Sequence, residues 1–150
     1  MEQRINIQEK GQNALKLLYN IGGYLKKSAL ENALLELVFF RVSQINSCAF
    51  CLDMHSKDAR AKGETEQRLY GLSAWRETPY YTTRERAALG WAEAVTACNV
   101  SDVVYQEAIK EFTEQELIDL TFAITTINTW NRLNLAFPTQ AGTYQVGQFS

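Results

Sequence analysis

A short segment combines two cysteines with the only histidine of the chain. Residues 47–55 read Ser-Cys-Ala-Phe-Cys-Leu-Asp-Met-His, so Cys48 and Cys51 form a CxxC pair that His55 follows four residues later. Neighbouring thiols can form a disulfide and reopen it through thiolate attack, and an imidazole can carry the protons. We therefore interpret this segment as a candidate site of thiol redox chemistry.

A helix that begins at Cys48 would carry all three side chains on one face. Cys48, Cys51 and His55 are related as i, i+3 and i+7. Ser47 is the predicted N-cap, so both sulfurs would lie in or near the first turn, where free backbone N–H groups favour negative charge. This position should lower a thiol pKa. The argument slightly favours Cys48 as the reactive thiol, because it lies at the very start of the helix.

An acidic residue inside an apolar run is the fourth candidate. Glu36 interrupts the apolar residues of 34–40, about ten residues before a turn predicted at Asn46, and His55 lies about nine residues after it. If the two helices form an antiparallel hairpin, a rise of about 1.5 Å per residue brings both side chains to roughly 14 to 15 Å from the turn. A buried carboxylate there would orient the imidazole and exchange protons with it.

The elements that must position these residues are predicted to be helices, and the fold class is all-α. Apolar residues recur every three or four positions, and only two prolines occur in the chain. The tail after Pro138 is predicted to be an irregular arm on the surface or on a neighbouring subunit. The predicted helices cover Ser28–Ile45 with Ser28 as cap, Cys48 to about Lys62 with Gly63 as stop, Thr65 to about Trp75, Thr83–Ala97 after a Thr82/Glu85 capping box, a Ser101-capped helix to about Phe112, and a helix opened by Thr113/Glu116 to about Leu135.

Composition excludes several classes of function. With 150 residues, we expect a single domain over 1–150 with its core at about 28–137. A net charge of −2 and no basic run longer than Lys26-Lys27 argue against nucleic-acid binding. The N-terminus lacks the pattern of a signal peptide and no apolar stretch approaches the roughly 20 residues of a membrane span, so we expect a cytoplasmic protein that binds no membrane.

Simpler explanations exist for each candidate residue. A cytosolic CxxC can bind zinc, but one helix carrying both thiols and His55 spans about 10 Å, which strains tetrahedral ligation, and only Glu36 or Cys98 could complete the site. Cys48 and Cys51 could also be two buried apolar thiols. Cys98 is predicted to lie in the core. The solvated face of the helix is predicted to carry Asp53, Lys57, Asp58 and Arg60.

The spacing of the four candidates resembles a known signature. Glu36, eleven residues, Cys48, two residues, Cys51, three residues and His55 match the pattern of the alkylhydroperoxidase D (AhpD) branch of the carboxymuconolactone decarboxylase-like family. The flanking segments strengthen the resemblance, which spans about residues 30–137. These segments are residues 40–46 (FRVSQIN), 53–60 (DMHSKDAR), 85–94 (ERAALGWAEA) and 128–133 (NTWNRL).

The resemblance implies an AhpD-like helical bundle, assembly into trimers or hexamers, and reduction of hydroperoxides by a cysteine pair. It implies that Cys51 attacks the peroxide, that Cys48 resolves the product as a disulfide, and that Glu36 and His55 relay protons. It further implies re-reduction by a dithiol or lipoyl-type donor, with no cofactor. Lactone decarboxylases of the wider family generally lack the cysteine pair, so its presence favours redox chemistry.

We therefore predict a homo-oligomeric, thiol-dependent peroxidase that reduces small organic hydroperoxides or hydrogen peroxide without metal, flavin or nucleotide. Two alternatives remain. One is a cofactor-free decarboxylase or isomerase that uses Glu36 and His55 as acid and base. The other is a non-enzymatic oligomeric module, in which the many aromatic residues serve packing alone.

Overall fold

Helices form all the regular secondary structure of residues 4–149, the part of the chain that this computed structural model describes. The predicted all-α class is therefore confirmed, and the chain is a single domain. None of these helices is long and apolar enough to cross a membrane. The elements are α1 (Ile7–Lys10), α2 (Gln12–Lys26), α3 (Asn32–Ile45), α4 (Ala49–Ala61), α5 (Glu66–Gly71), a 3₁₀ turn η1 (Leu72–Ala74), α6 (Thr83–Thr96), α7 (Asp102–Glu111) and α8 (Glu114–Ala136).

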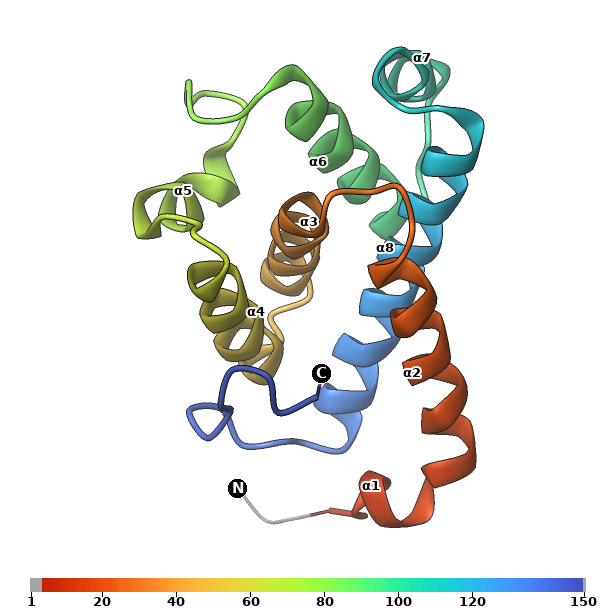
Figure 1. The fold of residues 1–150 in the computed structure, drawn as a ribbon, viewed down its shortest axis with the longest axis vertical. Helices are drawn as coiled ribbons and strands as arrows, with labels where there is room; N and C mark the ends of the chain where they lie inside the picture. The colour runs from red at the N-terminus through yellow and green to blue at the C-terminus, as the bar shows by residue number, and fades with distance from the viewer. Residues whose placement is uncertain (1–3, 150) are drawn as a thin grey trace.

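The central helix of the bundle is α3. It contacts α4, α6 and α8, which surround it in Figure 1, while α2 lies along α8 on the outside. All five residues from Leu34 to Val38 are buried, so this stretch of α3 has no solvated face. Glu36 belongs to this stretch, which explains how a carboxylate comes to lie inside the bundle.

Helix starts with a capping box lie where the sequence predicts them. The Thr82 hydroxyl accepts from the Glu85 backbone N–H, and the Glu85 carboxylate accepts in return from the Thr82 N–H. Thr113 and Glu116 form the same reciprocal pair at the start of α8. Each box satisfies two N–H groups that the helix leaves free, so a local pattern is enough to fix these starts.

The helix start predicted at Ser28 is wrong, and the N-terminal helices α1 and α2 were not predicted. The Ser28 hydroxyl donates to the Leu25 carbonyl at 2.7 Å and accepts from the Leu30 N–H at 3.3 Å, so it closes the turn after α2. The central helix starts four residues later, at Asn32. A serine satisfies either a helix start or a turn, and here the turn uses it.

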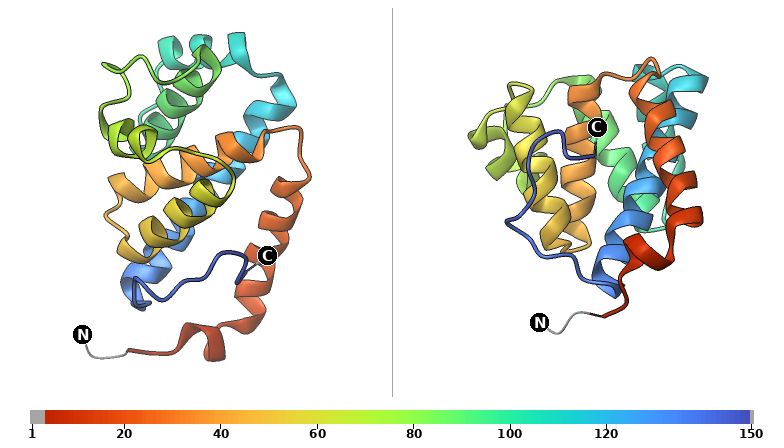
Figure 2. Two further views of the ribbon diagram at one scale, coloured as in Figure 1. Left: turned by 60° about the vertical axis from the view of Figure 1, so that its left-hand side comes forward. Right: turned by 60° about the horizontal axis from the view of Figure 1, so that its bottom comes forward.

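The tail after α8 is irregular, as predicted, but it folds back on the chain's own α4. Figure 2 shows this segment turning from the end of α8 and passing along α4. Tyr144 is buried, and its hydroxyl donates to the Asp58 carboxylate at 2.8 Å. The Lys57 ammonium donates to the Tyr144 carbonyl, and the Gly142 N–H donates to Asp53. Asp53, Lys57 and Asp58 therefore hold the tail, and the predicted solvated face is largely covered.

Candidate active site

A Schellman motif at the end of α3 places the first cysteine. Ser47 has a φ of 55°, its N–H donates to the Gln44 carbonyl, and the Cys48 N–H donates to the Ser43 carbonyl at 3.1 Å. The next helix then begins directly, with Cys48 as the N-cap of α4. The prediction of Ser47 as N-cap is wrong, because Ser47 takes the left-handed position that ends α3.

Side-chain amides from α8 fix this turn. The Asn46 amide donates to the side-chain oxygens of Asn128 and Asn131, both at 2.9 Å. The Asn131 amide in turn donates to the Ser43 hydroxyl at 3.0 Å, and both of these side chains are fully buried. A buried polar network whose members are all paired holds a single geometry. The cysteine pair therefore lies on a rigid support.

The two cysteines are joined as a disulfide, with their Cα atoms 5.3 Å apart. Both residues are only 1% exposed. Cys51 lies in the first turn of α4, and the Asn134 amide of α8 approaches its sulfur at 3.7 Å. The structure thus shows the oxidised form of a CxxC pair, enclosed between α4 and α8.

The predicted pairing of Glu36 with His55 is confirmed. The His55 Nδ1 atom lies 2.9 Å from a carboxylate oxygen of Glu36, across the antiparallel hairpin of α3 and α4. The Phe39 ring packs on the imidazole with ring centroids 5.1 Å apart. Glu36 and His55 are 8% and 7% exposed, so the pair lies in a largely dry environment.

Lys62 completes the surroundings of the carboxylate. Its ammonium donates to the second oxygen of Glu36 at 2.6 Å from the end of α4. Burial by itself raises the pKa of Glu36, but the hydrogen bonds and positive charges of His55 and Lys62 outweigh burial and hold this pKa below its ordinary value. Glu36 is therefore ionised at neutral pH.

The second nitrogen of the imidazole is available for chemistry. An ionised carboxylate only accepts hydrogen bonds, so the His55 Nδ1 atom must carry a hydrogen and donate it to Glu36. In the neutral ring, Nε2 then holds a free lone pair. Nε2 is buried and has no hydrogen-bond partner among residues 4–149. Buried polar atoms are nearly always paired, so an unpaired one marks a candidate functional group. As an imidazole nitrogen, Nε2 is suited to accept or deliver a proton.

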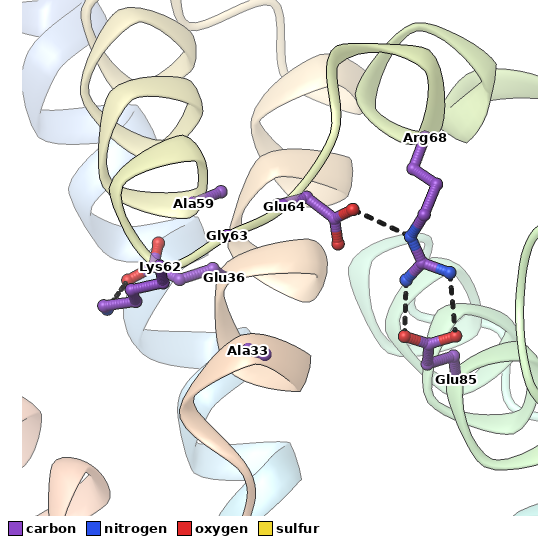
Figure 3. Close-up of a pocket in the computed structure, with 8 residues that line it drawn as sticks. All are labelled: Ala33, Glu36, Ala59, Lys62, Gly63, Glu64, Arg68 and Glu85. Carbon is purple, nitrogen blue, oxygen red and sulfur yellow. Dashed lines mark hydrogen bonds and ion pairs between the residues drawn. The ribbon is translucent and has the colours of Figure 1, made fainter.

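A small pocket opens on the Lys62 side of the pair. It has a volume of about 170 Å³, and its lining includes Glu36 and Lys62. In Figure 3 these two side chains meet on one side, and Arg68 lies between Glu64 and Glu85 on the other. The carboxylate of Glu36 therefore connects the buried imidazole with a polar opening to solvent.

The free cysteine is not where the sequence placed it. Cys98 is exposed, whereas we predicted that it lies in the core. Its φ is 53°, and the N–H groups of Cys98 and Asn99 donate to the carbonyls of Val95 and Ala94, so it occupies the left-handed position of a Schellman motif that ends α6. The chain turns outward there, which carries the side chain away from the core.

The four predicted site residues thus come together, and the structure adds three neighbours that sequence reasoning missed. Lys62 lies seven residues after His55 and shares its helix face, so the spacing alone could have indicated Lys62 as a neighbour of the site. Asn134 of α8 contacts the Cys51 sulfur, and Tyr144 of the tail contacts Asp58 on the helix that carries Cys51 and His55. Their contacts join residues more than 80 positions apart, and no local pattern in the sequence indicates them.

Comparison with protein families agrees with this geometry. Residues 12–94, more than half of the chain, match the model of the carboxymuconolactone decarboxylase family. The chain belongs to this family. The family match ends within α6, so it includes the whole Glu36, Cys48, Cys51 and His55 constellation.

Relatives place the chain among the AhpD-like members of the carboxymuconolactone decarboxylase family. It is 40% identical to the uncharacterized protein YdfG of Bacillus subtilis over 144 residues, which is 94% of this chain and 98% of that protein. A crystal structure of ATU0492 from Agrobacterium tumefaciens, a protein of unknown function and candidate antioxidant-defence protein AhpD, is 39% identical with a TM-score of 0.90, covering 95% and 100% of the two chains.

A more distant structure shares the fold alone. It is an uncharacterized peroxidase-related protein with an alkylhydroperoxidase AhpD core from Ralstonia eutropha, 16% identical with a TM-score of 0.77, and it covers 88% of this chain and 72% of that one. The AhpD-like fold predicted from the sequence is therefore confirmed.

Proposed function

We propose that this protein is a thiol-dependent peroxidase that reduces small organic hydroperoxides or hydrogen peroxide. The observation that carries the proposal is the Cys48–Cys51 disulfide beside an imidazole whose Nε2 atom is buried and unpaired among the described residues. The reduced, dithiol form of this pair supplies two electrons as it closes to the disulfide, and the imidazole supplies the proton that a peroxide needs when its O–O bond breaks.

In the first step the Cys51 thiolate attacks the outer oxygen of the peroxide. An S–O bond forms, the O–O bond breaks, and the departing alkoxide takes a proton and leaves as an alcohol, or as water from hydrogen peroxide. Cys51 is now a sulfenic acid, oxidised by two electrons. The Cys48 thiolate then attacks its sulfur, the S–S bond forms, and the hydroxyl group leaves as water.

One contact and one helix spacing support Cys51 rather than Cys48 as the attacking thiol. Cys51 lies one helical turn before His55, so the two side chains are neighbours on the same face of α4. The Asn134 amide contacts its sulfur at 3.7 Å. Cys48 is the N-cap of α4, and in the disulfide its sulfur accepts no hydrogen bond from an α4 backbone N–H.

The proton relay runs from the pocket to the sulfur. Glu36 joins Lys62 at one oxygen to His55 at the other, and the pocket of about 170 Å³ lets water reach this carboxylate. We assign the relay to Glu36 and His55, with Lys62 as a positioning residue that holds the carboxylate ionised.

The disulfide must be reduced again to complete a cycle. A dithiol or lipoyl-type donor would attack one sulfur, form a mixed disulfide and leave oxidised, with both protein thiols restored. Assembly into trimers or hexamers remains a prediction, as does a cytoplasmic location. No cofactor enters the proposed cycle.

A peroxidase assay on cysteine variants tests the proposal. Wild-type protein should consume an organic hydroperoxide in the presence of a dithiol donor, and Cys48→Ser and Cys51→Ser should both lose turnover. Cys98→Ser is the matched control, since this thiol is exposed and free, and it should keep full activity. Turnover that survives in Cys51→Ser would overturn the proposal, because peroxide reduction would then not need this thiol.

A further inference from the structure

Asn134 presents an N–H group to the sulfur of Cys51, and its orientation is fixed by its other contacts. The Asn134 Nδ2 atom donates to the Trp130 carbonyl at 3.0 Å. A carbonyl oxygen only accepts hydrogen bonds, so the atom facing it must be the amide nitrogen and not the amide oxygen. The second hydrogen of the same nitrogen is then free for the Cys51 sulfur, 3.7 Å away.

The tail holds this amide in place from the opposite side. The Thr139 hydroxyl donates to the Asn134 Oδ1 atom at 2.8 Å. All three polar positions of the amide therefore have partners: a backbone carbonyl, a hydroxyl and the sulfur. An amide fixed in this way needs little reorganisation when charge develops on the atom it faces.

The surroundings of Cys51 offer a thiolate little other stabilisation than this N–H group. Asn134 lies in the last turn of α8, whose terminal carbonyls disfavour a nearby negative charge. Cys51 is 1% exposed, so water cannot solvate its thiolate. Among residues 4–149, the Asn134 amide is the one group that donates a hydrogen bond to a sulfur of the pair, and that sulfur belongs to Cys51. Without it, only the free N–H groups at the start of α4 would offset the negative end of α8 beside a buried thiolate.

We propose that Asn134 is a further catalytic residue, which stabilises the thiolate of Cys51 through a charge-assisted hydrogen bond and thereby selects Cys51 as the attacking sulfur. The inference rests on the proposed peroxidase function for its role in turnover. The hydrogen bond itself concerns only the ionisation of the reduced protein, and it can be measured without any peroxide.

The experiment titrates Cys51 alone in full-length reduced protein. In a Cys48→Ser, Cys98→Ser background Cys51 is the only thiol, and its pKa follows from ultraviolet thiolate absorbance against pH. Asn134→Leu removes the donor at similar volume, and it should raise the pKa of Cys51 by about one unit, a tenfold change in the ionisation constant. Asn134→Asp replaces the donor with a negative charge and should raise this pKa at least as much.

Two further variants separate the hydrogen bond from general disturbance of the fold. Asn20→Asp makes the same chemical change at an exposed position of α2 and should leave the pKa of Cys51 unchanged. Thr139→Val frees the amide without removing it and should give a smaller rise than Asn134→Leu. Circular dichroism confirms that each variant is folded, and Asn134→Asp and Thr139→Val decide the matter if Asn134→Leu does not fold.

The proposal is overturned if the folded variants at Asn134 leave the pKa of Cys51 at its unsubstituted value. The result is independent of the peroxidase assay. A shifted pKa without peroxidase activity would keep the assignment of Asn134 and remove the proposed function, whereas peroxidase activity with an unshifted pKa would do the reverse.

Discussion

Two carboxylates of the bundle, Glu36 in α3 and Glu93 in α6, have similar partners and different uses. Glu93 accepts from the Trp75 indole at 2.9 Å and from two arginines, Arg41 at 2.8 Å and Arg76 at 2.6 Å. Glu36 accepts from an aromatic N–H group and a lysine. In both cases burial opposes ionisation, and the hydrogen bonds and cations outweigh it and lower the pKa.

The two carboxylates differ in whether their hydrogen-bond donors can gain or lose a proton. An indole and a guanidinium keep their hydrogens at any physiological pH, so the contacts of Glu93 can only hold α3, α6 and the segment after η1 together. An imidazole gains and loses a proton near neutral pH, and the Nε2 atom of His55 has no partner among the described residues. A carboxylate held only by donors that keep their hydrogens thus supports structure, while one bound to a ring with a free nitrogen supports proton transfer.

The largest expected effect is on peroxide reduction when the relay is broken. Glu36→Gln keeps the shape of the side chain and an oxygen that can accept from the imidazole, but it removes the negative charge that stabilises the protonated ring. We expect the rate of peroxide reduction to fall about 100-fold or more, and His55→Gln should do the same. Stopped-flow measurement of hydroperoxide consumption by reduced protein checks this.

Glu93→Gln is the matched control for the same change, and its peroxide rate should equal that of wild type. Equal losses in Glu36→Gln and Glu93→Gln would show that the comparison between the two carboxylates fails.

The next largest effect is on stability, and we expect it for substitution of Glu93. Glu93→Gln leaves the guanidinium of Arg41, whose side chain is 16% exposed, without its charged partner. We expect a loss of about 1.5 to 3 kcal/mol in the free energy of unfolding, because hydrogen bonds to charged groups contribute that much. Urea denaturation followed by circular dichroism measures it, and an unchanged midpoint would contradict the structural role of Glu93.

A smaller effect is expected at Lys62. Its side chain is 45% exposed, so water screens its attraction to Glu36. Lys62→Met should slow peroxide reduction about threefold, the effect of losing a solvent-screened ion pair. Lys57→Met is the control on the same helix, because Lys57 binds Asp53 and the tail rather than Glu36. A loss in Lys57→Met equal to that in Lys62→Met would argue against a role for Lys62 in the relay.

The smallest effect is the acid dependence of stability. The pKa of Glu36 in the folded protein lies below its ordinary value of 4.5, so its ion pairs stabilise the fold fully above that pH. This stabilisation is lost as the pH falls through the lowered pKa. Glu36→Gln should therefore reduce the decline in unfolding free energy below about pH 4.5, measured by urea titrations across that range. If the unfolding free energy of Glu36→Gln fell with pH as steeply as that of wild type, the lowered pKa of Glu36 would be contradicted.

The sequence predicted those parts of the molecule that depend on local patterns or on the hairpin. Two capping boxes fixed the starts of α6 and α8, and counting residues from the turn paired Glu36 with His55 correctly. The left-handed residues at Ser47 and Cys98 could not be predicted, because neither is a glycine. These two positions account for the wrong N-cap of α4 and for the exposure of Cys98.

Contacts made by distant segments lie beyond such reasoning. Asn134 and Tyr144 reach α4 only because α8 packs against the hairpin and the tail folds back, and both arrangements depend on the packed bundle. Ser28 shows the same limit at short range, since a turn and a helix start compete for one hydroxyl and tertiary packing decides between them.

Counting thiols before and after one equivalent of hydroperoxide tests the central claim most directly. Reduced protein should expose three thiols on denaturation and lose two of them to the peroxide, with peptide mapping showing a Cys48–Cys51 disulfide and an intact Cys98. A dithiol should then restore all three. An unchanged count of three, or a loss confined to Cys98, would contradict the account.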